Sequence, residues 1–258
     1  MRREMTAGPV IFPALPAVDR RVFIPDDIWL LTDGTWRRVS RRDDPAVWNQ
    51  VVVADDAVVT QLKDGIWPSS SSSAPTVMAR MIAALRLEPG MRVLEIGTGT
   101  GWNAARLAAL GADVVSVEMD GDIAAQARAN LRNAGYGNVL VVAGDGEHGA
   151  LDHAPFDRVI STAAVRRLPF AWVEQCAEGG LIVTPYTGEG HVDALLVFTV
   201  SANVARGRVQ GNAYFMPLRG HGVPQAEQRA TESHDELRIE VTKEGQHLSY
   251  GERQSSTG

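Results

Sequence analysis

The chain has little of several features that mark specialised classes of protein. It has one cysteine, Cys176, so it can form no internal disulfide, and a reducing compartment is expected. We expect this thiol to be buried and inert within a helical turn over 172–176. No apolar run approaches the roughly 18–20 residues that span a bilayer. Residues 1–4 are not followed by the apolar core of a secretory signal. We therefore expect a cytoplasmic protein with no membrane partner.

Positive charge and metal ligands are also scarce. Lysine and arginine total 25 against 31 aspartate and glutamate residues, which gives a net charge of −6. A protein that lives on phosphate backbones needs a basic face, so we expect no nucleic-acid partner. His148 and His153 have no cysteine or second pair of ligands at metal-binding spacing, so we expect no metal site. The hydrophobic content of 45% is that of an ordinary globular protein.

Changes in composition along the chain divide it into three units. Residues 1–68 are rich in proline, with short strands predicted at 51–53 and 57–60 that form a hairpin across 54–56. Residues 69–218 form the main domain, which begins with five serines whose composition is typical of a flexible linker. Residues 219–258 are a polar extension, with strands predicted at 237–242 and 246–250.

The main domain alternates between strand and helix patterns from Pro75 onward. Strands are predicted at 91–97, 112–118, 138–143, 156–162 and 180–185, and helices at 75–85, 102–110, 122–133 and 169–177. The strands are nearly all apolar, as in a parallel sheet that is covered on both faces. Two further strands, 194–200 and 209–215, should pair antiparallel at the sheet edge. The prediction is an α/β fold with a doubly wound, mostly parallel, seven-stranded Rossmann-like sheet and N- and C-terminal extensions.

The most informative motif is a glycine turn that follows the first strand of this sheet. Gly97, Gly99 and Gly101 alternate, and a helical pattern begins at Trp102. Such glycines let the backbone turn sharply and approach a ligand closely. A dinucleotide-binding turn needs its third glycine where Trp102 stands. With the acidic Glu95 at its head, the turn instead suits S-adenosylmethionine (SAM), whose sulfonium is cationic. A glycine turn that binds nothing is the alternative.

Two acidic residues at later strand ends support a SAM site, because ligands of open α/β sheets bind beyond the carboxyl ends of the strands. Glu118 lies about 20 residues after the turn, a spacing suited to the hydroxyls of a ribose. Asp145, between two glycines, can accept a hydrogen bond from the adenine amine. A solvated acid and a plain turn are the respective alternatives. The residues expected to bind the cofactor are Glu95, Gly97, Thr98, Gly99, Thr100, Gly101, Glu118, Met119, Gly144, Asp145, Gly146 and Thr162.

This ordered set resembles the protein-L-isoaspartate O-methyltransferase family over roughly residues 18–220. The matching segments, in order, are 22–25, 71–75 (in the place of a Thr-Ile-Ser-Gln-Pro motif), 93–101, 144–146, 154–157 and 215–218. The resemblance implies a SAM-dependent methyltransferase that forms S-adenosylhomocysteine. It also implies that the acceptor is a carboxylate in a peptide or protein that contains an aspartyl or isoaspartyl residue.

The resemblance also identifies Ser73 as the active-site serine, with Ser71 and Ser72 as neighbours that the sequence cannot separate from it. A carboxylate acceptor has an unperturbed pKa near ~4 and is ionised at neutral pH, so it needs no general base. A hydroxyl that orients the carboxylate is sufficient. The N-terminus of the helix predicted from Pro75 also favours an anion there.

The chain departs from the family pattern at two places. The motif around Ser73 is all serine before Ala74, and Val165-Arg166-Arg167 stands where the family usually has proline. We expect four residues to bind substrate, Ala163, Ala164, Arg166 and Arg167; the arginines would pair with an acidic peptide. A solvated basic turn is an equal alternative. The departures resemble a branch of the family that methylates aspartate in ribosomally made peptides (RiPPs) and leads to aspartimide. We therefore predict such a dedicated modifier, with general isoaspartyl repair as the alternative.

Two other classes of function are weaker hypotheses. A methyltransferase that acts on the amino groups of nucleic acids needs a polar-Pro-Pro-aromatic stretch after the fourth strand, where this chain has Ser161-Thr162-Ala163-Ala164. A non-catalytic peptide-binding protein with a SAM-type fold is disfavoured by the presence of Ser73 and the cofactor residues.

Overall fold

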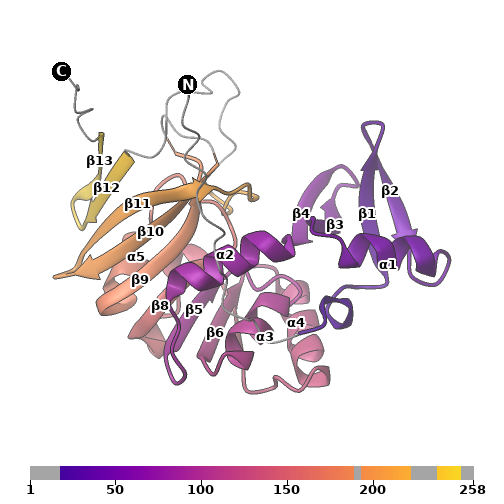
Figure 1. Cartoon of the computed structure of the whole chain (residues 1–258), viewed down its shortest axis with the longest axis horizontal. Helices are drawn as coiled ribbons and strands as arrows, with labels where there is room; N and C mark the ends of the chain where they lie inside the picture. The colour runs from indigo at the N-terminus through magenta and orange to yellow at the C-terminus, as the bar shows by residue number, and fades with distance from the viewer. Residues whose placement is uncertain (1–17, 189–192, 222–236, 251–258) are drawn as a thin grey trace, which may run out of the picture.

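The computed structural model describes residues 18–188, 193–221 and 237–250. These residues form a four-stranded sheet near the N-terminus and a nine-stranded sheet that makes up the body of the molecule. The small sheet lies at one end, beside the helices that cover the large sheet (Figure 1). Within the described ranges, no helix is long and apolar enough to cross a membrane.

The small sheet is antiparallel, with the strand order β2-β1-β3-β4. Its strands are β1 (Asp27–Thr32), β2 (Thr35–Ser40), β3 (Val58–Lys63) and β4 (Trp67–Ser72), and a 3-10 turn, η1 (Arg20–Val22), precedes them. Helix α1 (Pro45–Val53) contacts β2 and η1. The predicted strand at 51–53 and its hairpin are therefore wrong. A helix forms there because Pro45 suits the first turn, the Asp44 side chain accepts from Val47 N, and Trp48 and Val52 bury one helical face.

The serine run is a strand rather than a flexible linker. Ser69–Ser72 belong to β4, which pairs antiparallel with β3. Cross-strand polar contacts support the pairing, because Ser69 Oγ donates to Gln61 Oε1 at 2.7 Å and Thr60 Oγ1 donates to Ser70 Oγ at 3.2 Å. The predicted unit boundary between residues 68 and 69 therefore falls inside β4. The chain leaves the small sheet after Ser72 and enters helix α2 (Pro75–Leu85).

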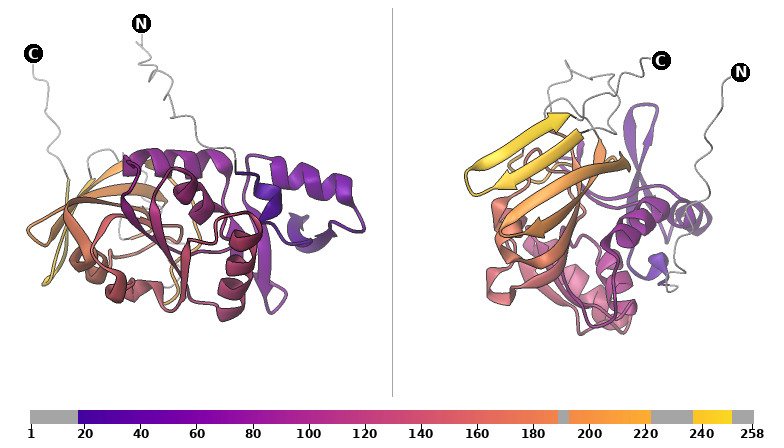
Figure 2. Two further views of the ribbon diagram at one scale, coloured as in Figure 1. Left: turned by 90° about the horizontal axis from the view of Figure 1, so that it is seen from below. Right: turned by 60° about the vertical axis from the view of Figure 1, so that its left-hand side comes forward.

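The parallel part of the large sheet is doubly wound, as predicted. In the order β9-β8-β5-β6-β7, its strands are β9 (Cys176–Tyr186), β8 (Phe156–Ser161), β5 (Arg92–Ile96), β6 (Asp113–Glu118) and β7 (Leu140–Ala143). Helices α2, α3 (Trp102–Ala109) and α4 (Gly121–Asn133) pack on one face and share a buried cluster with Val93 and Val114. Helix α5 (Phe170–Gln175), preceded by η2 (Gly146–His148) and η3 (Leu151–His153), packs on the other face beside Leu94 and Val115. Figure 2 shows the strands and helices from two further directions.

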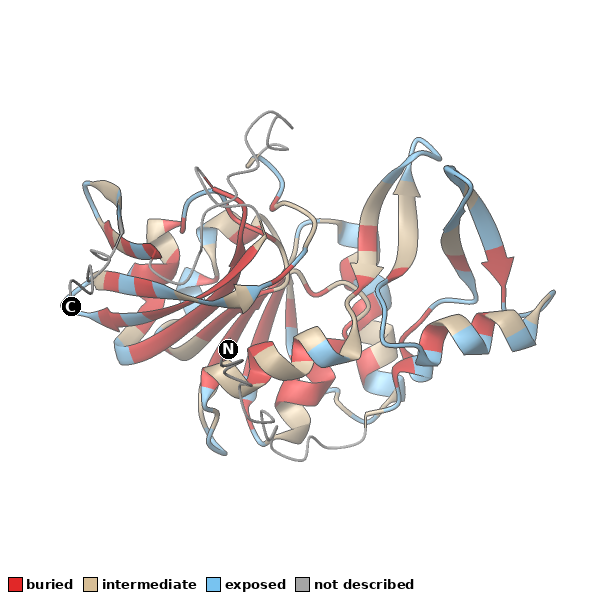
Figure 3. Cartoon of the chain, turned by 45° about the horizontal axis from the view of Figure 1, so that its top comes forward, coloured by how far each residue is buried: buried red, intermediate tan, exposed pale blue. Residues whose placement is uncertain are grey.

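The remaining strands extend the sheet in the antiparallel sense. They are β10 (Ala194–Ser201), β11 (Val204–Asn212), β12 (Leu237–Thr242) and β13 (Gly245–Tyr250). The predicted antiparallel edge is confirmed, although its second strand begins earlier than expected, at Val204. The sheet has nine strands rather than seven because β12 pairs with β11 and buries Leu237, Ile239 and Val241. Buried residues run the length of the central strands (Figure 3).

Cys176 begins β9 and does not belong to the preceding helix, which corrects that part of the prediction. Its side chain is buried, and burial raises the pKa of the thiol to about 12. The reactive thiolate is therefore scarce at neutral pH, as expected of an inert core cysteine.

Candidate active site

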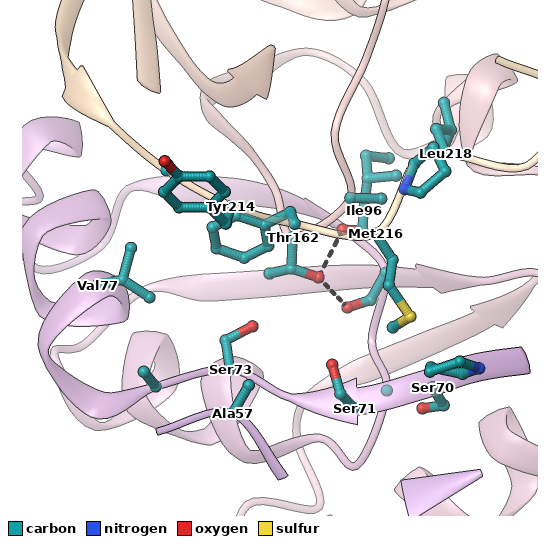
Figure 4. A pocket seen from close by; sticks show the side chains of 18 of the residues that line it. Ala57, Ser70, Ser71, Ser73, Val77, Ile96, Thr162, Tyr214, Met216 and Leu218 are labelled. Atoms are coloured by element: carbon teal, nitrogen blue, oxygen red, sulfur yellow. Dashed lines mark hydrogen bonds between the residues drawn. The ribbon is translucent and has the colours of Figure 1, made fainter. Parts of the chain in front are cut away.

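A cavity of about 830 Å³ opens where β5, β6 and β8 end, facing the last residues of β4. Its wall combines the serine strand and the start of α2, the glycine turn after β5, the residues after β6, β7 and β8, and the segment 212–219 that follows β11. This volume falls within the range of small-molecule sites. Figure 4 shows side chains from these segments converging on one space.

The glycine turn forms the floor of the cavity through Gly97 and Gly99. Both have positive φ, +87° and +53°. A Cβ on Gly97 would lie 2.6 Å from Thr162 Oγ1, which itself donates to Ile96 O and Gly97 O. A Cβ on Gly99 would lie 3.6 Å from Ser71 O. The turn is thus packed against both the β8 end and the serine strand, and only glycine fits at Gly97.

Three predicted cofactor residues of this turn do not line the cavity. Thr98 is buried, and its Oγ1 shares a hydrogen bond with Ser116 Oγ. The carbonyl of Thr100 accepts from Asn130 on α4. Gly101 is the N-cap of α3 and is pressed against Leu131. These residues shape the turn from behind and do not line the cavity, and their contact with the cofactor stays a prediction.

Glu95 also differs from its expected place. Its side chain is fully buried and does not line the cavity. Its two carboxylate oxygens accept from Asn103 Nδ2 on α3 and from Ser116 Oγ on β6. Burial raises the pKa of this carboxyl to about 7, and the nearby Glu118 adds to the effect. Glu95 is therefore a buried support for the glycine turn.

The raised pKa of Glu95 predicts a pH dependence of stability. The folded protein keeps the proton up to about pH 7, whereas the unfolded chain loses it near pH 4.5. Glu95 should therefore lower the free energy of unfolding as pH rises between these values, by up to about 3 kcal/mol. Glu95→Gln should abolish this component, which urea unfolding at pH 5 and pH 8 measures. Parallel losses of stability in wild type and variant across that range would contradict the prediction.

Glu118 and Met119 do line the cavity. The carboxylate of Glu118 accepts from Gly99 N at 2.9 Å and from Asp120 N at 3.1 Å. It therefore fastens the glycine turn while keeping acceptor capacity toward the cavity. Met119 is 40% exposed and adds apolar surface at the same end. This combination suits a ribose and an attached ring, and that role stays a prediction.

The acidic turn after β7 completes this end of the cavity. Asp145 and Gly146 line it, and Gly144 does not. Asp145 Oδ1 accepts from Glu147 N at 2.9 Å, which leaves further carboxylate lone pairs. A Cβ on Gly146 would lie 2.5 Å from Ile96 Cγ2. Glycine is required at that position because the turn packs tightly on the end of β5.

The structure separates the serines that the sequence could not. Ser71 and Ser73 line the cavity, and their hydroxyls point into it, toward the wall that carries Thr162 and Met216 (Figure 4). No described residue is a hydrogen-bond partner of either hydroxyl. Ser72 is buried and faces the opposite way, where its Oγ accepts from Arg20 Nε at 3.0 Å. Two hydroxyls, rather than three, are therefore available to a ligand.

The predicted substrate residues also divide into two groups. Ala163 lines the cavity beside Thr162. Ala164 is buried, with its N–H donating to Met216 O and its carbonyl accepting from Leu218 N. This pairing directs Arg166 and Arg167 away, into a separate cavity of about 530 Å³ that also contains Glu147 and His221. The two arginines thus do not lie beside Ser71 and Ser73, contrary to expectation.

Sequence reasoning missed the outer wall of the cavity. Arg80 on α2 lies there, and its Nη2 donates to the carbonyl of Asn212. Tyr214 is 75% exposed at the rim, and Asp55 and Asp56 also line the cavity. The segment 215–218 was recognised only as a landmark of the family, although Met216 lies directly opposite Ser71 (Figure 4). Among the described residues, no group of three histidine, cysteine or acidic side chains could hold a metal ion.

Comparison with solved structures gives the class of the fold. A protein-L-isoaspartate O-methyltransferase matches with a TM-score of 0.66 and 23% identity, covering 79% of this chain and 89% of the other. Another from Plasmodium falciparum, in complex with S-adenosyl-L-homocysteine, matches with a TM-score of 0.56 and 18% identity, covering 66% and 83%. These likenesses show that the fold is that of the SAM-dependent methyltransferases.

Sequence comparison gives the family. The model described as "Protein-L-isoaspartate(D-aspartate) O-methyltransferase (PCMT)" matches residues 49–222, so the chain belongs to this family. A protein-L-isoaspartate O-methyltransferase of Koribacter versatilis is 42% identical over 149 residues, covering 58% of this chain and 67% of the relative. Protein-L-isoaspartate O-methyltransferase 2 of an Anaeromyxobacter strain is 32% identical over 212 residues, covering 82% and 76%. The chain is thus an enzyme of the methyltransferase class whose methyl donor is SAM.

Proposed function

We propose that this enzyme methylates the free carboxylate of isoaspartyl residues in proteins and peptides. The observation that carries the proposal is one cavity lined by a glycine turn, by two acids and by the hydroxyls of Ser71 and Ser73, which have no hydrogen-bond partner among the described residues. The names of the relatives support isoaspartate as the acceptor. They support the general enzyme better than the dedicated RiPP modifier that we first expected, which has no support among them.

At the donor end, the chain supplies a shaped backbone and carboxylates. Gly97 and Gly99 leave room for a ligand against the turn, and Glu118 and Asp145 offer acceptors for its hydroxyl and amino groups. Bound SAM would supply the methyl group: a C–O bond to the carboxylate would form as the C–S bond breaks, which gives a methyl ester and S-adenosylhomocysteine with an uncharged sulfur. The residues present fit this donor because the carboxylates of Glu118 and Asp145 line the cavity there, and the guanidinium of Arg219, which also lines it, lies 3.9 Å from the carboxylate of Asp120.

At the acceptor end, Ser71 and Ser73 can donate hydrogen bonds to a carboxylate. The carboxylate is already ionised at neutral pH, so the hydroxyls need only hold one oxygen in line with the methyl group. Attack brings together opposite charges, and the apolar side chains of Ile96, Val77 and Met216 in the wall limit their contact with water. The chain thus contributes orientation and exclusion of water rather than proton transfer.

The product chemistry follows from the ester. The backbone nitrogen that follows the esterified residue attacks the ester carbonyl and expels methanol, which leaves a cyclic aspartimide. This step needs no residue of the enzyme, because methanol leaves far more readily from the ester than an oxygen leaves from the ionised carboxylate. Opening of the ring by water then yields aspartyl and isoaspartyl products, which is the chemistry of repair.

Matched peptides test the proposal. Two peptides of the same sequence, one with isoaspartate and one with aspartate at the same position, are incubated with enzyme and SAM. Mass spectrometry then follows methyl gain and the later loss of methanol. Efficient methylation of the isoaspartyl peptide, with little methylation of the aspartyl one, is the expected result. Preference for the aspartyl peptide would favour a dedicated modifier and overturn the proposal.

A further inference from the structure

The buried guanidinium of Arg20 joins the N-terminal segment to Ser72 and Ser73. Arg20 is 6% exposed and lies outside the residues matched by the family model. Its Nη2 donates to the carbonyls of Ser72 and Ser73, at 2.7 Å and 3.0 Å, and its Nε donates to Ser72 Oγ. Arg20 therefore holds the peptide carbonyls directly before and after the Cα of Ser73.

Further contacts anchor this side chain at the end of α1. Nη1 donates to the carbonyls of Val52 and Ala54, and Nη2 donates to that of Asp56. These carbonyls belong to the last turn of α1 and the loop after it, where a cation also interacts favourably with the helix dipole. All these acceptors are uncharged. The hydrogen bonds thus fix the position of the guanidinium, and the nearby carboxylates of Asp55 and Asp56 favour its charge.

Arg20 also touches the donor side of the site. Its guanidinium lies over the ring of Trp102, 5.3 Å from the centroid, and Trp102 begins α3 directly after the glycine turn. Trp102 Nε1 in turn donates to the carbonyl of Val18, two residues before Arg20. Arg20 thus contacts both the serine strand β4 and helix α3, which follows the glycine turn.

We propose that Arg20 is a positioning residue for methyl transfer, which fixes Ser73 relative to the glycine turn. It does not touch substrate, because it does not line the cavity and acts through the carbonyls behind it. The position needs arginine because Nε, Nη1 and Nη2 of one guanidinium donate to acceptors on both β4 and α1, whereas the single ammonium of lysine cannot reach them all. The proposal rests on the proposed function, which names the carboxylate that is methylated. The contacts of Arg20 with Ser72, Ser73 and Trp102 do not depend on that choice.

The expected effect is on turnover more than on cofactor binding. A small displacement of a positioning group lowers rate steeply, so Arg20→Lys and Arg20→Met should lower kcat by roughly 10- to 100-fold. The dissociation constant of SAM, measured by calorimetry, should change little because the glycine turn keeps its own contacts with Glu118 and Thr162. Added guanidinium ions at millimolar concentration should restore part of the activity of Arg20→Ala, in which the side chain is removed.

The adjacent Arg21 supplies the matched control. It is exposed and pairs only with Asp19 among the described residues, at 2.7 Å, so Arg21→Met should keep wild-type kcat. Hydrogen–deuterium exchange of a peptide covering 68–76 gives a second readout, and the Arg20 variants should exchange faster there than Arg21→Met. Urea unfolding confirms that each variant is folded, and Arg20→Lys is the milder probe if Arg20→Met is not.

Two results would overturn the inference. Wild-type kcat and exchange in Arg20→Lys would show that the contacts do not position Ser73. Equal losses of SAM affinity, stability and kcat, without rescue by guanidinium, would show a purely structural role. An inactive wild type on isoaspartyl peptide would instead count against the proposed function, while the exchange measurement still tests Arg20.

Discussion

Replacement of Ser73 by alanine is expected to lower kcat about a hundredfold while leaving the affinity for SAM unchanged. The hydroxyl of Ser73 points into the cavity and has no hydrogen-bond partner among the described residues, so it can donate a hydrogen bond to a ligand (Figure 4). Loss of a group that aligns the reacting atoms costs about this much when the rest of the site is intact. Initial rates with saturating SAM and isoaspartyl peptide, together with calorimetry of SAM binding, measure both quantities.

The neighbouring serines make this prediction specific. Ser71→Ala should lower kcat as well, because its hydroxyl also faces the cavity. Ser72→Ala is the matched control, since Ser72 points away and Arg20 still holds the carbonyls of Ser72 and Ser73. Its loss of activity should be much smaller. Equal activity of Ser73→Ala and wild type would show that another group orients the carboxylate.

Replacement of Gly97 by alanine is expected to weaken SAM binding at least about tenfold. A non-glycine residue at φ +87° costs roughly 1–2 kcal/mol, and the added Cβ would meet Thr162 Oγ1 at 2.6 Å. Thr162 cannot yield freely, because it is bonded to the carbonyls of Ile96 and Gly97. The turn must therefore move, and each 1.4 kcal/mol lost from binding is a factor of ten. Calorimetry with SAM or S-adenosylhomocysteine measures the change.

A second glycine separates local strain from loss of the site. Gly135 follows α4 with φ +85°, and its Cβ would meet nothing within 4 Å. Gly135→Ala should lower stability through the same backbone strain but bind SAM like wild type. Undiminished SAM affinity in a folded Gly97→Ala protein would mean that the glycine turn is not the donor site.

The sequence predicts the large sheet well because its signals are local. Apolar strands alternating with helical patterns, and glycines at alternate positions after Ile96, need no knowledge of distant contacts. The sequence also predicts the strands at 237–242 and 246–250, which are β12 and β13, but it does not predict that β12 pairs with β11 or that β4 is a strand, because long-range pairing decides both. Ser69–Ser72 are polar and have weak strand propensity, and it is their pairing with β3 that makes them a strand.

The errors at the site also have physical causes. Glu95 lies on the same face of β5 as Val93, so strand alternation directs it under α3 and toward Asn103 rather than into the cavity. Arg166 and Arg167 follow Ala164 and Val165, whose backbone bridges to Pro217 and Tyr186 turn the chain away from the serines. Arg20 could not be found from the sequence, because its acceptors lie 32 to 53 residues away.

The central claim is that this cavity joins a SAM-binding turn to serines that orient an isoaspartyl carboxylate. The ratio of kcat/KM for the matched isoaspartyl and aspartyl peptides tests it most directly. The structure and the family predict a ratio well above one for wild type, with both activities lowered about a hundredfold in Ser73→Ala. A ratio below one, or no methyl transfer to either peptide by an enzyme that binds SAM, would contradict the account.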